Sequence, residues 1–377
     1  MLLNFCRLNV ITILLLGLLA IYVNGQPGRP CTTPNGESTQ CISIYNCPIL
    51  YGALTSKNKD TVRFLRASQC GFDVDPYVCC GTTASYQRTP SVRPTRRQIQ
   101  GGQSLLPNRQ NCGFQVDERV LGGTETTKRE FPWMALLQYK KNSGGLTFSC
   151  GGVIINKRYI LTAAHCVTGQ ITQRVGQLVN VRLGEWDTRT DEDCDEIGGF
   201  RDCIEPAVDY GVEETIPHSD YDDNSRNRYH DIALIRLNRV ITTSDTIRPI
   251  CMPTASERAA PSEILWVAGW GRTEYANNSP VKLKVGLPVT QTSKCSNTFK
   301  SASVTLADTQ ICAGGEVNKD SCSGDSGGPL MKLHERNNQW ILEGVVSFGT
   351  RCGTQNWPGI YTRVSKYLDW ISNNIAP

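Results

Sequence analysis

The sequence predicts an all-β protein, built as an antiparallel sandwich or barrel, with a C-terminal helix and a small disulfide-rich module in front. After Cys112 the chain consists of short β-rich runs separated by Gly, Asn and Pro, a texture typical of such architectures. The clearest runs are residues 153–155, 232–237, 265–268 and 343–348. Helical spacing occurs only over residues 364–371, where four apolar side chains share one face. They are Val364, Tyr367, Leu368 and Ile371.

Length and charge limit the possible functions. A chain of 377 residues is long enough for two or three domains. The formal net charge is only +4 at pH 7, and the charges are dispersed along the chain. We therefore expect neither nucleic acid nor a membrane surface as a partner.

The N-terminus is typical of a secretory signal peptide. Arg7 precedes an uncharged run over residues 10–23, and small residues follow up to Gly25. We expect residues 1–25 to be removed and the secreted, soluble chain to start near Gln26. A signal anchor is the alternative, which the short run disfavours.

The cysteine count fits an oxidising compartment. Of the 17 cysteines, Cys6 leaves with the signal peptide, so that six remain between Cys31 and Cys80 and ten between Cys112 and Cys352. Both numbers are even, which favours disulfides. Zinc is the competing use, but paired C-x-x-C spacing with nearby histidines is missing from the sequence.

Residues 31–80 predict a compact module that depends on its disulfides. A block of this length rarely buries enough apolar surface to fold unaided, and three disulfides contribute about 2 to 4 kcal/mol each. The following stretch R-T-P-S-V-R-P-T-R-R-Q-I-Q-G-G-Q is rich in Pro, Gly and like charges, which predicts a linker.

The stretch C-S-G-D-S-G-G-P, residues 322–329, places Ser326 between an acid and glycines. A turn is the simple interpretation. The alternative is a nucleophile, which needs an imidazole as base and a carboxylate to orient that imidazole. His165, in L-T-A-A-H-C, and Asp231, in D-I-A-L, are the candidates. A structural histidine and a capping acid are their simpler interpretations.

These three segments, in the order His, Asp, Ser, resemble the trypsin-like serine proteases of the chymotrypsin fold over residues 120 to about 375. The resemblance implies a double six-stranded β-barrel with the catalytic triad in its cleft. His165 would act as general base and then acid, Asp231 would hold its tautomer, and Ser326 would form the acyl-enzyme. Backbone N–H groups of Gly324 and Ser326 would form the oxyanion hole.

The resemblance also implies a substrate preference. Asp320 matches the acid at the base of the family's specificity pocket, which predicts cleavage after Arg or Lys. Gly349 and Gly359 match the glycines that keep this pocket open, and Ser347 lies in the strand that pairs with the substrate backbone. A solvated loop aspartate is the alternative for Asp320. Phe348, where Trp is commoner, and Arg351 depart from the family pattern.

An activation site is implied by Arg119 and the following V-L-G-G. Cleavage would free the Val120 amine to pair with Asp325, which would order the pocket and the oxyanion hole. We therefore expect a zymogen with a trypsin-like activator. The domains would be residues 1–25, 31–80, 81–119 and 120–377, as signal peptide, disulfide-rich module, linker with activation segment, and protease.

Further features follow from the same resemblance. Related proteases bind calcium at positions matching Glu185, Asp187, Thr190 and Asp193, although this acid-rich loop is equally typical of a solvated surface. Catalysis would need no cofactor. Asn277 lies in the one glycosylation sequon, weakened by Pro280. The implied protease disulfides are Cys112–Cys251, Cys150–Cys166, Cys194–Cys203, Cys295–Cys312 and Cys322–Cys352.

The spacing C-x9-C-x5-C-x22-C-x8-C-C resembles the clip domain of arthropod clip-domain serine proteases, of the Easter-like, prophenoloxidase-activating or Spätzle-processing type. The implied pairs are Cys31–Cys79, Cys41–Cys70 and Cys47–Cys80.

The family implies a haemolymph zymogen cascade in innate immunity. Its targets would be a cytokine precursor such as a Toll ligand, prophenoloxidase or another protease zymogen, and a serpin would be the inhibitor. The alternatives are an adaptor with an inert protease fold and a venom or other extracellular trypsin. The clip domain itself is expected to dock partners, with a spacer role as the alternative.

Overall fold

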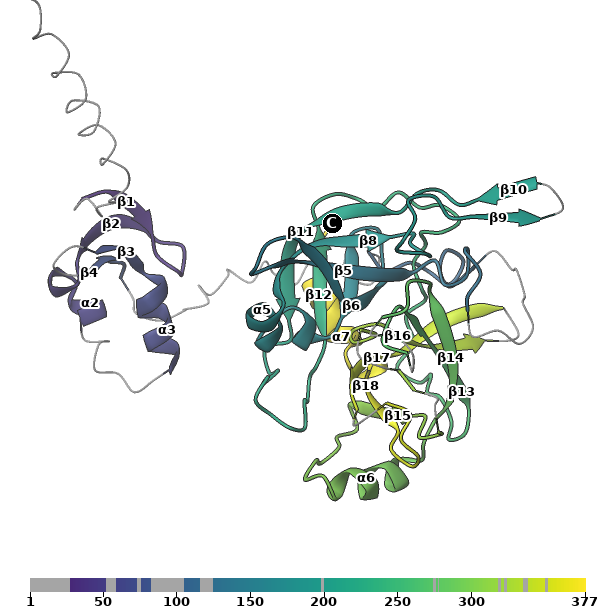
Figure 1. The fold of residues 1–377 in the computed structure, drawn as a ribbon. Coiled ribbons are helices and arrows are strands. Elements are labelled where there is room, and N and C mark those ends of the chain that lie inside the picture. Colours follow the sequence, from purple (N-terminus) through teal and green to yellow (C-terminus); the bar gives the residue numbers. More distant parts are fainter. Residues whose placement is uncertain are drawn as a thin grey trace, which may run out of the picture. The chain divides into compact units, whose positions relative to one another are not determined.

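The computed structural model divides the chain into two compact units, Met1–Gln98 and Ile99–Pro377 (Figure 1). The residues it describes are 28–51, 59–72, 76–82, 105–115, 125–197, 200–273, 276, 278–317, 320–321, 324–334, 338–349 and 352–377. The expected signal peptide and most of the linker lie outside them. Among the described helices, none combines the length and the apolar composition that crossing a membrane requires.

The first unit contains a four-stranded antiparallel sheet in the order β1-β2-β4-β3. Its strands are β1 (Pro30–Thr32), β2 (Ser38–Ser43), β3 (Gln69–Phe72) and β4 (Pro76–Cys79). Two short helices, α2 (Pro48–Tyr51) and α3 (Lys59–Ala67), lie between β2 and β3 in the chain. Disulfides join Cys31 to Cys79, Cys41 to Cys70 and Cys47 to Cys80.

The apolar core of this unit is small. Its described members are Ile44, Cys47, Leu50, Phe64 and Val78, all nearly inaccessible to solvent. So few side chains contribute too little hydrophobic free energy to order the unit alone, and the disulfides therefore supply much of its stability.

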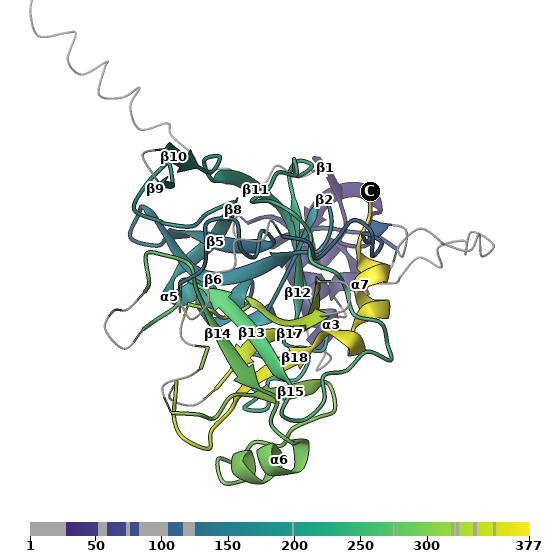
Figure 2. The ribbon, with the colours of Figure 1, turned by 90° about the vertical axis from the view of Figure 1, so that its right-hand side faces the viewer.

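The second unit begins with a closed barrel in the order β11-β12-β7-β6-β5-β8. The strands are β5 (Met134–Lys141), β6 (Leu146–Ile154), β7 (Tyr159–Thr162), β8 (Gly176–Leu183), β11 (Val208–Pro217) and β12 (Ala233–Leu237). A separate hairpin of β9 (Cys194–Ile197) and β10 (Phe200–Cys203) extends from this barrel and is closed by the Cys194–Cys203 disulfide (Figures 1 and 2).

A second six-stranded sheet has the order β14-β13-β16-β17-β18-β15. Its strands are β13 (Ile264–Gly269), β14 (Leu283–Pro288), β15 (Gln310–Ala313), β16 (Pro329–His334), β17 (Gln339–Phe348) and β18 (Gly359–Arg363). An antiparallel bridge between Val289 and Ala313 brings the two edges together. The expected double β-barrel is confirmed.

One apolar cluster spans both barrels. It includes Leu137 and Ile160 from the first barrel and Met331, Leu342 and Val345 from the second. The second barrel also has a separate apolar cluster of its own. The Cys112–Cys251 disulfide and hydrogen bonds at Gly113 attach residues 105–115 to the same unit.

The C-terminal helix differs from the expected span. A 3-10 turn, Val364–Lys366, comes first, and the α-helix α7 (Leu368–Asn374) starts after Tyr367, whose φ of −120° interrupts the helical backbone. Val364, Tyr367 and Ile371 are nonetheless buried as the spacing predicts. The apolar face is therefore buried even though the helical hydrogen bonding of the segment is interrupted at Tyr367.

Replacing Phe64 with alanine should unfold the first unit selectively. Phe64 is 0% exposed in a small core, and truncating such a ring costs about 3 to 5 kcal/mol. Hydrogen exchange of the full chain should show lost protection in β2 and β4 and unchanged protection in the two six-stranded barrels. The control Tyr45→Ala removes an aromatic ring that is 59% exposed and should leave both units protected. Retained protection in Phe64→Ala would contradict this account of the core.

Candidate active site

Asp231 lies at the start of β12 and is completely buried. Its backbone carbonyl accepts a hydrogen bond of 2.7 Å from Thr362 Oγ1 in β18 of the second barrel. Its carboxylate faces the short 3-10 turn Ala164–Cys166, which carries His165. Residues from both barrels therefore determine where this acid lies.

Two hydrogen bonds join His165 to Asp231. The ring Nδ1 of His165 lies 2.8 Å from Asp231 Oδ2, and the backbone N–H of His165 donates to Oδ1 at 3.0 Å. Ser347 Oγ donates a third hydrogen bond to Oδ2 at 2.5 Å. Holding Nδ1 against the carboxylate keeps the ring proton there and leaves Nε2 as the basic nitrogen.

The charge of Asp231 is maintained despite its burial. Burial alone would raise the pKa of this carboxyl, but the charge of His165 and the hydrogen bonds from His165 and Ser347 outweigh it and lower the pKa. The acid is therefore ionised at neutral pH and stabilises a protonated His165.

Ser326 is held next to the His165 turn by close backbone packing. Its carbonyl accepts a hydrogen bond of 2.8 Å from the N–H of Gly151 in β6. The following residue, Gly327, has φ of +79°, and a methyl group there would lie 2.2 Å from Thr162 Oγ1 and 3.1 Å from Cys166 Sγ. Only glycine fits this position, and the Cys150–Cys166 disulfide reinforces the contact.

Gly324 and Asp325 pack against the end of β13. Gly324 has φ of +104°, and a methyl group there would lie 2.8 Å from Gly271 Cα. Asp325 Oδ1 accepts a hydrogen bond of 2.9 Å from the N–H of Gly271. The position of Gly271 thus determines where the backbone of Gly324 and the carboxylate of Asp325 lie. The Arg119–Val120 bond, which sequence reasoning linked to Asp325, lies outside the described residues.

Asp320 is a half-buried acid, one oxygen of which is fully buried. Its Oδ2 accepts a hydrogen bond of 3.2 Å from Gly353 N–H, whereas the buried Oδ1 has no hydrogen-bond partner among the described residues. Burial raises the pKa of this carboxyl to about 6, although backbone hydrogen bonds from Gly353 and Ser321 oppose the rise. An arginine or lysine side chain is the type of group that would satisfy the free oxygen.

Glycines leave space above this acid. A methyl group at Gly359 would lie 3.2 Å from Asp320 Oδ1 and 3.1 Å from the Tyr361 ring, and one at Gly349 would approach Gly359 Cα to 3.9 Å. Larger side chains at either position would narrow the approach to Asp320. The hydroxyl of Ser347 donates to Asp231, a contact that leaves the backbone of this residue, which is expected to pair with the substrate, uninvolved.

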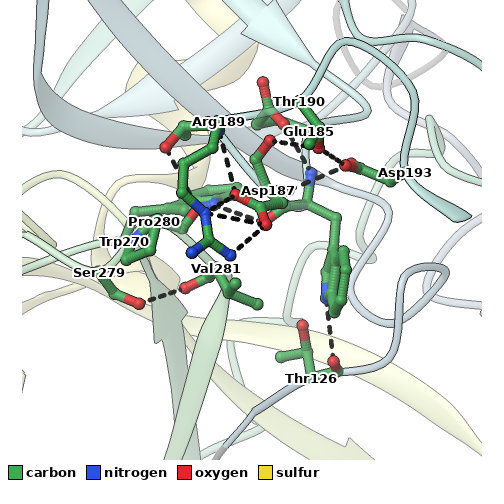
Figure 3. A network of polar contacts seen from close by, with 12 residues as sticks. Thr126, Glu185, Asp187, Arg189, Thr190, Asp193, Trp270, Ser279, Pro280 and Val281 are labelled. Atoms are coloured by element: carbon green, nitrogen blue, oxygen red, sulfur yellow. Dashed lines mark hydrogen bonds and ion pairs between the residues drawn. The ribbon is translucent and has the colours of Figure 1, made fainter. Parts of the chain in front are cut away.

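The acid-rich loop of residues 185–193 packs against β14 and the end of β13 (Figure 3). Glu185, Asp187 and Asp193 are buried. Thr190 Oγ1 donates to Asp193 Oδ1 at 2.5 Å, and the N–H of Asp187 donates to Asp193 Oδ2 at 3.1 Å. Asp187 also forms an ion pair with Arg189. The loop is therefore ordered rather than a solvated acidic surface.

The charges in this loop fit a hard cation. Burial raises the pKa of Glu185, and the nearby charge of Asp193 adds to the rise while Arg182 opposes it. Two buried carboxylates that repel each other are the oxygen donors that calcium prefers. The side chains of Asp187 and Thr190 are already engaged, because the Asp187 carboxylate is paired with Arg189 and the Thr190 hydroxyl donates to Asp193. Only the backbone carbonyl oxygens of these two residues would be available to bind a cation.

Clusters of three or more metal-binding side chains occur elsewhere in the described chain. They are Cys31 with Cys70 and Cys79, Cys150 with His165 and Cys166, and Glu192 with Cys194 and Cys203. All of these cysteines are in disulfides. Cys295 pairs with Cys312, and Cys352 is also disulfide-bonded. Cys322 and the sequon residue Asn277 lie outside the described residues.

Sequence reasoning missed several residues that shape the site. The hydrogen bond of Ser347 to Asp231 spans 116 residues, and the contact of Gly327 with Thr162 is also long-range. The role of Gly271 in seating Gly324 and Asp325 has no local signal beyond the G-W-G string at 269–271.

Comparison with known proteins shows two family matches. The trypsin family model matches residues 120–371, and the model of the regulatory CLIP domain of proteinases matches residues 31–80. Phenoloxidase-activating factor 1 of Holotrichia diomphalia is 50% identical over 349 residues, which cover 92% of this chain and 93% of that protein. Serine protease ea of Drosophila melanogaster is 43% identical over 354 residues, covering 92% and 90%. The crystal structure of the Drosophila Grass clip serine protease of the Toll pathway is 34% identical, with a TM-score of 0.61, and covers 92% and 97%.

Binding of a cationic ligand should weaken as the pH falls through about 6. Below that value Asp320 takes up a proton, because its pKa is raised to about 6, and the neutral acid no longer attracts a cation. In the activated protein, the inhibition constant of benzamidine should rise by about tenfold per pH unit below pH 6. Benzamidine does not need His165 to react, so its binding isolates Asp320.

Asp320→Asn is the control for this prediction. It should bind benzamidine weakly and with no pH dependence between pH 5 and 7. A constant inhibition constant for the unmodified protein over the same range would show that Asp320 does not hold the cation.

Proposed function

The chain belongs to the trypsin family of serine proteases and carries the regulatory clip domain, and on this basis we propose that it is a secreted zymogen of an extracellular proteolytic cascade. It is a trypsin-like serine endopeptidase, and such enzymes need no cofactor for catalysis. The 16 cysteines after the expected signal peptide and the disulfides in both units support an extracellular location.

We propose the catalytic roles that the family resemblance implies for the three residues. Ser326 Oγ attacks the scissile carbonyl, and His165 takes its proton and then returns it to the leaving amine. Asp231 fixes the tautomer of His165, and the N–H groups of Gly324 and Ser326 stabilise the oxyanion. The observation that carries this proposal is the fully buried Asp231 carboxylate, 2.8 Å from His165 Nδ1. Ser326 is also present, which counts against an adaptor with an inert protease fold.

Asp320 selects Arg or Lys before the scissile bond. Its buried Oδ1, which has no hydrogen-bond partner among the described residues, supports this assignment, since an apolar substrate side chain would leave the charge unpaired. Cleavage after Arg119 would release the Val120 amine, and Asp325 would accept it. An upstream trypsin-like protease would make that cut.

The cascade is proposed to act in innate immunity. Similar proteins include factors named for phenoloxidase activation and a protease of the Toll pathway. The substrate would accordingly be prophenoloxidase, a cytokine precursor such as a Toll ligand, or a further protease zymogen. The clip domain would dock such partners, a serpin would terminate activity, and Asn277 would carry a glycan.

A structural calcium ion is proposed for the loop of residues 185–193. Glu185 and Asp193 would supply carboxylate oxygens, and Asp187 and Thr190 would supply backbone oxygens. The mutual repulsion of the two buried carboxylates supports this proposal. The ion would hold the loop in place and take no part in catalysis.

Activation and catalysis can be tested together. Treatment with a trypsin-like protease should cut after Arg119 and produce hydrolysis of an Arg-amide peptide. Ser326→Ala should be cut equally but lose activity by roughly 10⁵-fold or more, because no other group attacks the carbonyl. Ser256→Ala, an exposed serine, is the matched control. The proposal fails if cut Ser326→Ala turns over substrate like the unmodified enzyme, or if Arg119→Gln becomes active after the same treatment.

Calcium should stabilise the full chain. At about 100 times its dissociation constant the ion contributes about 2.7 kcal/mol, which raises Tm by roughly 5 to 10 °C. Glu185→Gln combined with Asp193→Asn should abolish this shift, while Asp191→Asn, an exposed acid of the same loop, should retain it. A Tm of the chelator-treated protein that calcium does not change would refute the site.

A further inference from the structure

Trp270 connects the acid-rich loop to the residues around Ser326. It directly follows β13, is 6% exposed, and donates a hydrogen bond of 3.0 Å from its indole Nε1 to the backbone carbonyl of Trp186. The N–H of Trp186 in turn donates to Glu185 Oε1 at 3.0 Å. The indole of Trp270 is therefore attached to the backbone of Trp186, whose N–H is held by Glu185.

A second set of hydrogen bonds connects the same segments (Figure 3). The N–H of Thr188 donates to the carbonyl of Pro280 at 2.9 Å, and Asp187 forms a β-bridge with Val281. The N–H of Ser279 then donates to the carbonyls of both Trp270 and Gly271, at 3.1 and 3.0 Å. The acid-rich loop thus holds Trp270 and Gly271 through a side chain and through the backbone.

A buried cation reinforces this contact. Lys282 Nζ lies 5.9 Å from the centre of the Trp270 ring, and the N–H of Lys282 donates to the carbonyl of Trp186 at 2.9 Å. Burial lowers the pKa of Lys282 to about 8, although the carboxylates of Glu185 and Asp193 oppose the change. The ammonium is therefore charged at neutral pH, between the aromatic ring and the acidic loop.

On its other side Gly271 contacts the oxyanion residues. Its N–H holds Asp325 Oδ1 at 2.9 Å, and a methyl group on Gly324 would lie only 2.8 Å from Gly271 Cα. The backbones are so close that a shift of Gly271 must move Gly324 or Asp325. The orientation of the Gly324 N–H therefore depends on where Trp270 is anchored.

We propose that Trp270 is a positioning residue for the oxyanion hole, which transmits the conformation of the acid-rich loop to Gly324 through Gly271. The inference deepens the proposed function, since it rests on Gly324 as an oxyanion donor. It assigns no contact with the substrate to Trp270. Loosening the anchor should weaken transition-state binding while leaving the Asp320 pocket intact.

The test compares two inhibitors of the activated full-length enzyme. A peptide arginine aldehyde adds to Ser326 Oγ, so that its carbonyl oxygen occupies the oxyanion hole, whereas benzamidine occupies only the Asp320 pocket. In Trp270→Phe, which keeps an aromatic ring but loses the indole N–H, aldehyde binding and kcat should fall together by roughly three- to thirtyfold. Benzamidine binding should stay within about twofold, since the pocket is unaltered.

Trp266→Phe is the matched control, because Trp266 lies in β13, the strand that Trp270 follows, and takes no part in the contacts described between Trp186 and Gly271. It should bind both inhibitors like the unmodified enzyme. Unchanged aldehyde binding in Trp270→Phe, or equal weakening of both inhibitors, would overturn the proposal. Activity remaining in Ser326→Ala would instead refute the proposed function, so the two failures are distinguishable.

Glu185→Ala tests the coupling without altering Trp270. Measured with a chelator present, it should weaken aldehyde binding and spare benzamidine, because the backbone N–H of Trp186 loses its acceptor and the residue is held less firmly. In the double variant Glu185→Ala with Trp270→Phe, the aldehyde should bind as in Trp270→Phe alone, since the connection is already broken. Additive losses, or no effect of Glu185→Ala on aldehyde binding, would contradict transmission through Trp270.

Discussion

The buried carboxylate of Asp231 is the constraint on which the catalytic unit depends. A charge with no access to water is tolerated only when hydrogen bonds and an opposite charge replace its hydration. The N–H and ring of His165 supply two of these contacts from the first barrel, and Ser347 supplies another from the second. The two barrels must therefore be joined for this acid to remain ionised, and the apolar cluster that spans both barrels joins them.

The same balance between burial and pairing has a different outcome at three other acids, Asp320, Glu185 and Asp193. At Asp320 one buried oxygen has no hydrogen-bond partner among the described residues, so that a cationic substrate of the kind we propose would recover the cost of its burial. In the loop of residues 185–193, Arg182, Arg189 and Lys282 offset part of the negative charge, while Glu185 and Asp193 still repel each other. Asp231 thus has hydrogen-bond donors on both carboxylate oxygens, which fix its orientation. Asp320 keeps one oxygen available for the cation that we propose it binds. The negative charge of Glu185 and Asp193 is only partly neutralised.

Much of the fold could be predicted because it follows from local patterns. The short β-rich runs, the cysteine-rich block and the three catalytic motifs indicated the double barrel, the clip domain and the enzyme class, all of which are confirmed. Strand ends and the split at Tyr367 could not be predicted, because tertiary packing sets where backbone hydrogen bonding stops. The family resemblance suggests that the backbone of Ser347 pairs with the substrate, but no local pattern indicates that its hydroxyl contacts Asp231.

By itself the sequence determined which chemical groups are available and in what order, since residue identity and short spacing are properties of neighbouring positions. It determined that a histidine, an acid and a glycine-flanked serine occur with an even set of cysteines in each module. Only the tertiary structure decided how strongly each acid is desolvated and which donors reach it. Contacts such as His165 with Asp231, 66 residues apart, exist because barrel packing closes distances that the chain leaves open.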